Sequence, residues 1–156
     1  MILLSFDTEE FDVPREHGVD FSLEEGMKVS IEGTNRILDI LKANNVCATF
    51  FCTGNFAELA PEVMERIKNE GHEVACHGVD HWQPKDDDVF RSKEIVERVA
   101  QQPVYGYRQP RMFAVSDHDI QAAGFQYNSS LNPAFIPGRY MHLRAPRTWF
   151  MKDGVM

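Results

Sequence analysis

The sequence contains no apolar run that approaches the roughly 20 residues needed to cross a bilayer, so no membrane-spanning segment is expected. No basic segment precedes the first apolar run at Ile2, so we expect no signal peptide and a cytoplasmic location. Positive charge is scarce, because 16 Lys and Arg stand against 24 Asp and Glu. Nucleic acids and anionic lipids require clustered basic side chains, and the net charge of −8 argues against both as main partners.

Cysteine is rare, and its count is odd. The three cysteines, Cys47, Cys52 and Cys76, all lie in apolar runs of the kind that strands contain. We therefore expect buried, reduced thiols rather than a disulfide, as in a reducing compartment.

The remaining composition, 43% apolar and 26% charged, is that of an ordinary globular protein. A chain of 156 residues is long enough for one domain that buries roughly 68–70% of its unfolded surface. No internal repeat, linker or low-complexity segment divides residues 1–156, so we expect a single domain.

Apolar segments of strand length alternate with segments of helical spacing along the chain. Strands are expected at residues 1–6, 46–52, 74–76, 104–107 and 125–127, and helices at 28–44, 61–70, from 86–88 to about 100, and 116–123. This alternation predicts an α/β fold with right-handed crossovers and a parallel sheet, either open or part of a (β/α) barrel.

Two segments are expected to be irregular. Residues 13–26 contain Pro14, Gly18 and Gly26 and show no clear period, which predicts a long loop over the site. Residues 139–150 also lack a period, and residues 151–156 resemble the start of a hairpin. A turn formed by Lys152, Asp153 and Gly154 predicts a following strand, so we expect the chain to be a fragment lacking its last strands.

A pair of histidines follows the third expected strand. His77 and His81 are four residues apart, so both imidazoles can face one point if the chain bends into a helical turn. Imidazole is the commonest protein ligand for zinc, and a catalytic zinc site uses three protein ligands. Taken alone, the spacing is more typical of a helix-start histidine near a surface histidine.

Acidic and basic side chains follow other strands. Asp7 and Glu9 come after the first strand, where acids more often cap a helix or lie in a solvated loop. Arg108 follows the fourth strand and, taken alone, is typical of a surface salt bridge. Their placement favours a shared site, because the carboxyl ends of parallel strands meet at one mouth.

Three motifs in this order resemble those of a known family. They are Ser5-Phe6-Asp7-Thr8-Glu9, His77-Gly78-Val79-Asp80-His81 and Tyr107-Arg108-Gln109-Pro110. This set is similar to the polysaccharide deacetylase family with the NodB homology domain (carbohydrate esterase family 4). The resemblance covers nearly the whole chain and implies a NodB-like distorted (β/α) barrel, incomplete at the C-terminus.

The resemblance also implies residue roles. Asp7 would be the general base for a metal-activated water, and Arg108 would pair with Asp7 and orient it. His77 and His81 would hold the metal together with an acid of the first motif. Because Thr8 replaces the adjacent aspartate of the common motif, Glu9 is the expected ligand, as in a branch of the family with the Asp-x-Glu spacing.

Other positions depart from the family pattern. Glu10 is the alternative ligand in the first motif. Glu9 is favoured over it, because Asp7 and Glu9 share one face of an extended segment. Gly78 replaces a small hydroxyl residue, which would remove one supporting hydrogen bond. Arg111 replaces a tyrosine, and its backbone N–H would still stabilise the oxyanion. The late histidine that protonates the leaving amine is absent or is His142.

We therefore expect a metal-dependent hydrolase that removes N-acetyl or O-acetyl groups from a carbohydrate. Zinc suits two imidazoles and a carboxylate, and cobalt, nickel or iron would also fit. One alternative is a metal-independent hydrolase of small cyclic amides or other C–N bonds. A second alternative is a non-catalytic sugar-binding module.

Overall fold

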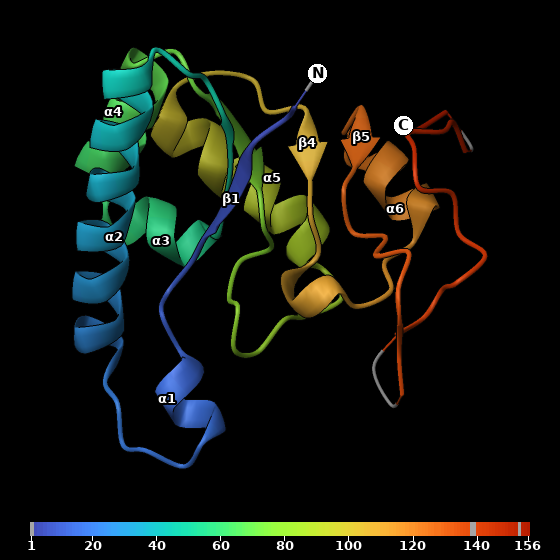
Figure 1. Ribbon diagram of the computed structural model, residues 1–156, viewed down its shortest axis with the longest axis horizontal. Coiled ribbons are helices and arrows are strands. Elements are labelled where there is room, and N and C mark those ends of the chain that lie inside the picture. Colours follow the sequence, from blue (N-terminus) through green and yellow to red (C-terminus); the bar gives the residue numbers. More distant parts are fainter. Residues whose placement is uncertain (1, 138–139, 153) are drawn as a thin grey trace.

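The computed structural model describes residues 2–137, 140–152 and 154–156 of the chain. Five parallel strands form one sheet whose order follows the chain (Figure 1). They are β1 (Ser5–Thr8), β2 (Thr49–Cys52), β3 (Glu73–Cys76), β4 (Gly106–Tyr107) and β5 (Tyr127–Asn128). The α/β fold with a parallel sheet, predicted from the sequence, is confirmed. An order without reversal is that of an arc of a (β/α) barrel, whereas doubly wound sheets reverse their order.

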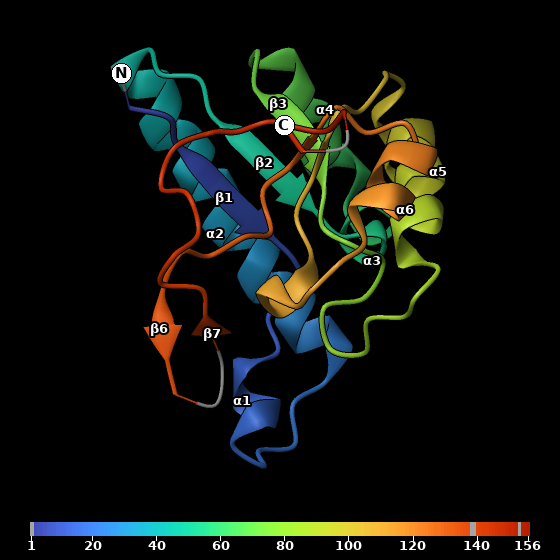
Figure 2. The same ribbon diagram turned by 90° about the vertical axis from the view of Figure 1, so that its right-hand side faces the viewer.

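Helices fill the connections between the strands. They are α1 (Val13–Glu16), α2 (Leu23–Asn44), α3 (Gly54–Leu59), α4 (Pro61–Asn69), α5 (Asp88–Ala100) and α6 (Asp117–Ala122). Right-handed crossovers between successive neighbouring strands place their helices on the same face of a sheet. Accordingly α2 packs on α4, α4 on α5 and α5 on α6, and Figure 2 shows α2 behind β1 and β2.

The strand residues alternate between two faces of the sheet. Those that meet the helices form the core and are buried: Phe50, Cys52, Val74, Cys76 and Tyr107. The intervening residues Asp7, Phe51 and Ala75 are in register across β1, β2 and β3 and point to the opposite face. Asp7 therefore points away from the helices, near the carboxyl end of β1, and the other candidate functional side chains follow the carboxyl ends of neighbouring strands.

The first strand lies later in the chain than its apolar run indicates. We expect residues 1–6, but β1 covers Ser5–Thr8, and the side chains of Ile2 and Leu3 are 87% and 82% exposed. The reason is register, since β1 pairs with β2 from Thr49 onward, and the N–H of Thr49 donates to the carbonyl of Leu4. An apolar run alone does not show at which of its residues the pairing with β2 begins.

The prediction of a loop over residues 13–26 is wrong. This segment contains α1 and the first turn of α2, with Pro14 in the first turn of α1. A capping box opens α2, because the Ser22 side chain accepts from the Glu25 N–H while Glu25 accepts from the Ser22 N–H. The Ser-x-x-Glu pattern is a sequence signal for this start.

This cap leads to a stability prediction. Replacing Ser22 by alanine leaves N–H groups at the start of α2 without their acceptor, so we expect the free energy of unfolding to fall by about 0.5–2 kcal/mol. Urea denaturation of the purified protein measures the change. Ser22→Asn keeps a capping oxygen and is expected to retain most of the stability. Equal losses in both variants would contradict the assignment.

Beyond β5 the chain forms a short antiparallel hairpin of β6 (Phe135–Ile136) and β7 (Tyr140–Met141). Part of the segment expected to be irregular is therefore a strand, while Arg139 lies outside the described residues. Near the end of the chain, Lys152 and Val155 form one antiparallel bridge, as a hairpin start would.

The cysteines only partly follow the prediction. Cys52 and Cys76 are buried, whereas Cys47 is exposed because β2 begins two residues after it. Burial raises the pKa of the Cys52 thiol to about 12, so it is protonated at neutral pH.

In the described part of the chain, none of the helices combines the length and apolar character that a membrane crossing requires.

Candidate metal centre

Hydrogen bonds of the sheet continue one step past the strands and fix the side chains that follow them. The N–H of the residue after one strand donates to the last carbonyl of its neighbour in four places: Thr53 to Thr8, His77 to Cys52, Arg108 to Cys76, and Ser129 to Tyr107. The backbone register therefore determines how the side chains at this edge lie relative to one another. Sheets hold such positions more rigidly than free loops do.

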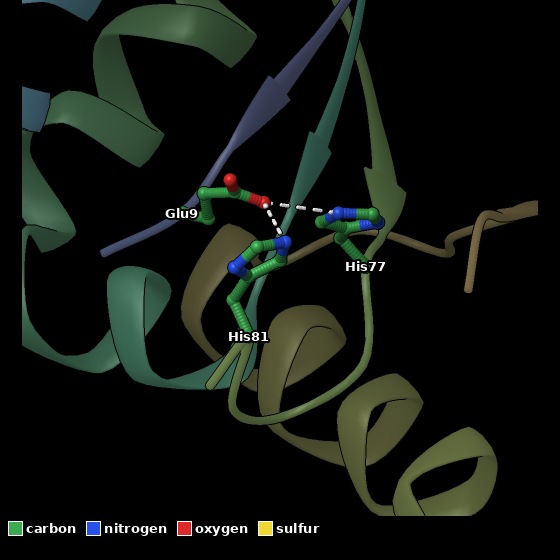
Figure 3. Close-up of side chains that lie close together, drawn as sticks. All are labelled: Glu9, His77 and His81. Carbon is green, nitrogen blue, oxygen red and sulfur yellow. Dashed lines mark ion pairs between the residues drawn. The ribbon is translucent and has the colours of Figure 1, made fainter. Parts of the chain in front are cut away.

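Glu9, His77 and His81 converge at this edge (Figure 3). Oε2 of Glu9 lies 3.1 Å from Nε2 of His77 and 3.3 Å from Nε2 of His81. All three ligand atoms lie within 4.8 Å of one another. The side chains of His77, His81 and Glu9 are 2%, 13% and 26% exposed, so the cluster is largely buried and Glu9 is its most exposed member. The structure thus brings together the three residues expected to hold a metal.

The remote nitrogens of both imidazoles are occupied by acceptors. Nδ1 of His77 lies 2.8 Å from the carbonyl oxygen of Arg108, and Nδ1 of His81 lies 2.8 Å from Oδ2 of Asp12. Because a carbonyl or a carboxylate only accepts, each Nδ1 carries the proton. In a neutral ring, Nε2 then presents its lone pair toward Glu9.

These three atoms fit a divalent cation. Oε2 of Glu9 is buried and has no hydrogen-bond donor among the described residues, which is costly for a carboxylate oxygen unless a positive charge lies beside it. A tetrahedral zinc site with metal–ligand distances of about 2.0–2.1 Å has neighbouring ligand atoms about 3.3–3.4 Å apart. The observed nitrogen–oxygen distances of 3.1 and 3.3 Å are close to that value. Two imidazoles with one carboxylate are also a donor set that catalytic zinc uses.

The loop between the two histidines is held by its backbone. Gly78 has a φ of +69°, and a Cβ there would lie 2.7 Å from Cγ of Pro110, so this position favours glycine. The N–H groups of Gly54 and Asn55 at the start of α3 donate to the carbonyls of Gly78 and Val79. The loop therefore has backbone support without the hydroxyl residue found in the family pattern.

Asp7 lies beside the cluster, and Arg108 holds it there. Nη1 of Arg108 lies 2.5 Å from Oδ1 of Asp7, while Oδ2 of Asp7 lies 4.0 Å from Nε2 of His77. Asp7 is outside the group of described residues whose ligand atoms lie within 4.8 Å of one another. This carboxylate is therefore adjacent to the cluster, with one oxygen bound to arginine and the other facing His77.

Arg108 itself is held on several sides. Its Nη2 donates to the hydroxyls of Ser5 and Ser129, and its guanidinium carbon lies 3.9 Å from the centroid of the Phe51 ring. Such contacts leave the guanidinium little freedom to rotate away from Asp7. The sequence gives no signal for the pairing with Ser5 or Phe51, since both depend on register across the sheet.

Glu10 points elsewhere. Its side chain is buried and accepts a 2.6 Å hydrogen bond from the Thr53 hydroxyl, which also caps α3. Burial raises the pKa of the Glu10 carboxyl. Neighbouring residues in an extended segment face opposite ways, which explains why Glu9 and not Glu10 reaches the histidines.

Two expected contributors are not placed in the cluster by the described contacts. His142 follows β7, its backbone N–H donates to the carbonyl of Ala134 and its carbonyl accepts from the N–H of Ala145, so its role as catalytic acid stays a prediction. Arg111 has a φ of +56° in the turn after β4, and the oxyanion role of its N–H also stays a prediction.

A comparison with known families adds independent information. The polysaccharide deacetylase family model matches residues 19–128, which is more than half of the chain. The chain belongs to the polysaccharide deacetylase family. The resemblance expected from the three motifs is therefore confirmed. The matched range contains His77, His81 and Arg108, whereas Asp7 and Glu9 precede it.

Individual members of the family resemble the chain over part of their length. A peptidoglycan-N-acetylglucosamine deacetylase of Bacillus cereus is 39% identical over 77 residues, covering 45% of this chain and 28% of that protein. A chitooligosaccharide deacetylase of Sinorhizobium fredii is 42% identical over 113 residues, covering 72% of this chain and 40% of that protein. The chain thus spans less than half the length of these curated relatives.

A solved structure shows the same architecture. The crystal structure of a candidate polysaccharide deacetylase from Mycobacterium smegmatis superposes with a TM-score of 0.66 at 28% identity. The superposition covers 83% of this chain and 50% of that one. The NodB-like fold predicted for the family is therefore observed in this chain.

Proposed function

We propose that this protein is a metal-dependent hydrolase that removes N-acetyl or O-acetyl groups from a carbohydrate by a metal-activated water with Asp7 as general base. The observation that carries the proposal is the convergence of Glu9, His77 and His81 on one point beside the Asp7–Arg108 pair. Family membership supports the same reaction class.

Glu9, His77 and His81 would hold the metal. Zinc suits this donor set, and cobalt, nickel or iron would also fit it. A bound divalent ion would supply positive charge that polarises the acyl carbonyl and lowers the pKa of water to roughly 7. Three protein ligands leave room for a substrate oxygen, as catalytic sites require.

Asp7 would accept the proton of the attacking water. Its Oδ2 faces the cluster at 4.0 Å from Nε2 of His77, and its Oδ1 is bound to Arg108. A base that is held near the metal without being a ligand keeps its lone pair for the substrate water. Arg108 would orient this carboxylate through its contacts with Ser5, Ser129 and Phe51.

The carbohydrate substrate is inferred from relatives. One is named for the N-acetylglucosamine of peptidoglycan and another for chitooligosaccharides. Both names describe removal of acetyl groups from sugar polymers or oligomers. We propose the same substrate class for this chain, with N-acetyl as the first acyl group to test.

The test is release of acetate from N-acetylglucosamine oligomers by the purified protein loaded with Zn²⁺. We expect release that stops on addition of a chelator and returns with added metal. Chelator-insensitive hydrolysis of a small cyclic amide would instead favour the metal-independent alternative. Oligosaccharide binding without product, measured by calorimetry, would favour a non-catalytic sugar-binding module. Either result would overturn the proposal.

A further inference from the structure

Asp12 is a buried acid that the reaction scheme above does not use. It precedes α1 as the N-cap residue, but its side chain makes no capping hydrogen bond to the helix. Instead, Oδ2 lies 2.8 Å from Nδ1 of His81, and the side chain is only 5% exposed. The buried carboxylate of Asp12 therefore contacts the ring of His81 instead of capping α1.

Arg111 holds this carboxylate from a second side. Its Nη2 lies 3.4 Å from Oδ2 of Asp12, and its Nε donates to the backbone carbonyl of His81 at 3.3 Å. Its Nη1 pairs with Glu16 in α1 at 2.6 Å. The arginine thus contacts both the backbone of His81 and the acid that contacts its ring, and it links both to α1.

The two histidines have supports of different charge. His77 is held by the neutral carbonyl of Arg108, whereas His81 is held by a carboxylate. A carboxylate on the remote nitrogen of a ligating imidazole fixes the tautomer and ring orientation, and it raises the basicity of the other nitrogen. An acceptor with full negative charge does this more strongly than a carbonyl.

We propose that Asp12 is a positioning residue that acts through His81 and sets the affinity of the site for its divalent metal, with Arg111 holding Asp12 in place. This inference rests on the proposed metal centre, because it concerns the strength of one of its three ligands. It also gives α1 and the turn after β4 a function, since both hold the same histidine.

The test is zinc affinity measured by competition with a chromophoric chelator. We expect Asp12→Ala to weaken binding by about 10- to 100-fold, as loss of such supports typically does. Asp12→Asn keeps an acceptor oxygen without its charge, so we expect a smaller loss in the same direction. Because Asp12 does not cap α1, neither variant removes a helix cap.

The matched control is Asp39→Asn. Asp39 is an exposed acid on α2 that pairs with Arg66 at 2.6 Å, so this variant removes the same charge outside the metal cluster. We expect zinc affinity to be unchanged in this variant. A general effect of net charge on metal binding would lower the affinity of both variants alike and would overturn the inference.

A spectroscopic readout separates positioning from a purely structural role. In the Co²⁺-loaded protein, the visible absorption reports ligand geometry, and we expect its intensity to change in both Asp12 variants. Lower thermal stability of the metal-free variants with unchanged affinity and spectrum would show a structural role and overturn the inference. Absence of metal binding by the wild type would overturn the proposed function itself, which distinguishes the two failures.

Discussion

Replacing His77 by alanine is expected to weaken zinc binding by about 10²–10³-fold. Structural zinc sites with four ligands have apparent binding free energies of about 10–16 kcal/mol, or about 2.5–4 kcal/mol per ligand, and 1.4 kcal/mol is about tenfold. His77 is the more deeply buried of the two histidines, with a side chain only 2% exposed. Solvent therefore has little access to replace the lost imidazole with the same geometry.

The measurement is zinc affinity by chelator competition, together with metal content after gel filtration. The control is His118→Ala, because the His118 side chain is 86% exposed and lies on α6. We expect the control to bind zinc like the wild type. Equal affinities for wild type and His77→Ala would mean that the metal, if bound, lies elsewhere.

The second large effect concerns Asp7. We expect Asp7→Asn to lower the rate of acetate release by about 10²–10⁴-fold, which is the usual contribution of a positioned general base. An amide has nearly the same shape as the carboxylate but does not accept a proton from water. Because Asp7 lies outside the set of converging ligand atoms, zinc affinity should be unchanged in this variant.

Rates are measured on N-acetylglucosamine oligomers, and zinc affinity is measured on the same preparations. Asp39→Asn serves as the control for loss of a carboxylate that is paired with arginine. An Asp7→Asn protein with the wild-type rate would contradict the role of base. A variant that loses both zinc and activity would place Asp7 among the ligands instead.

The sequence was sufficient to predict how the sheet places the site. Asp7 lies near the end of β1, His77 directly follows β3 and Arg108 directly follows β4, and parallel strands bring these ends together. Side chains of an extended segment alternate between its two faces, so Glu9 lies on the same face as Asp7 and Glu10 lies on the opposite face. The placement of the site residues follows from the shared direction of the strands, and the choice of Glu9 over Glu10 follows from a short stretch of sequence.

Other features depend on contacts between distant segments and were not predicted. The start of β1 depends on where β2 begins, so the apolar run at residues 1–6 was misleading. The Asp12–His81 hydrogen bond joins residues 69 positions apart, and no local pattern indicates it. By contrast, the start of α2 was locally encoded in Ser22 and Glu25, and the prediction of a loop there overlooked it.

Each role proposed for these residues depends on the binding of one divalent ion between two imidazoles and one carboxylate. Anomalous diffraction at the zinc absorption edge, from crystals grown with Zn²⁺, tests it most directly. We expect one strong peak within coordination distance of Nε2 of His77, Nε2 of His81 and Oε2 of Glu9, with Asp7 not coordinated. A peak coordinated by other residues, or no peak between the two imidazole rings, would contradict it.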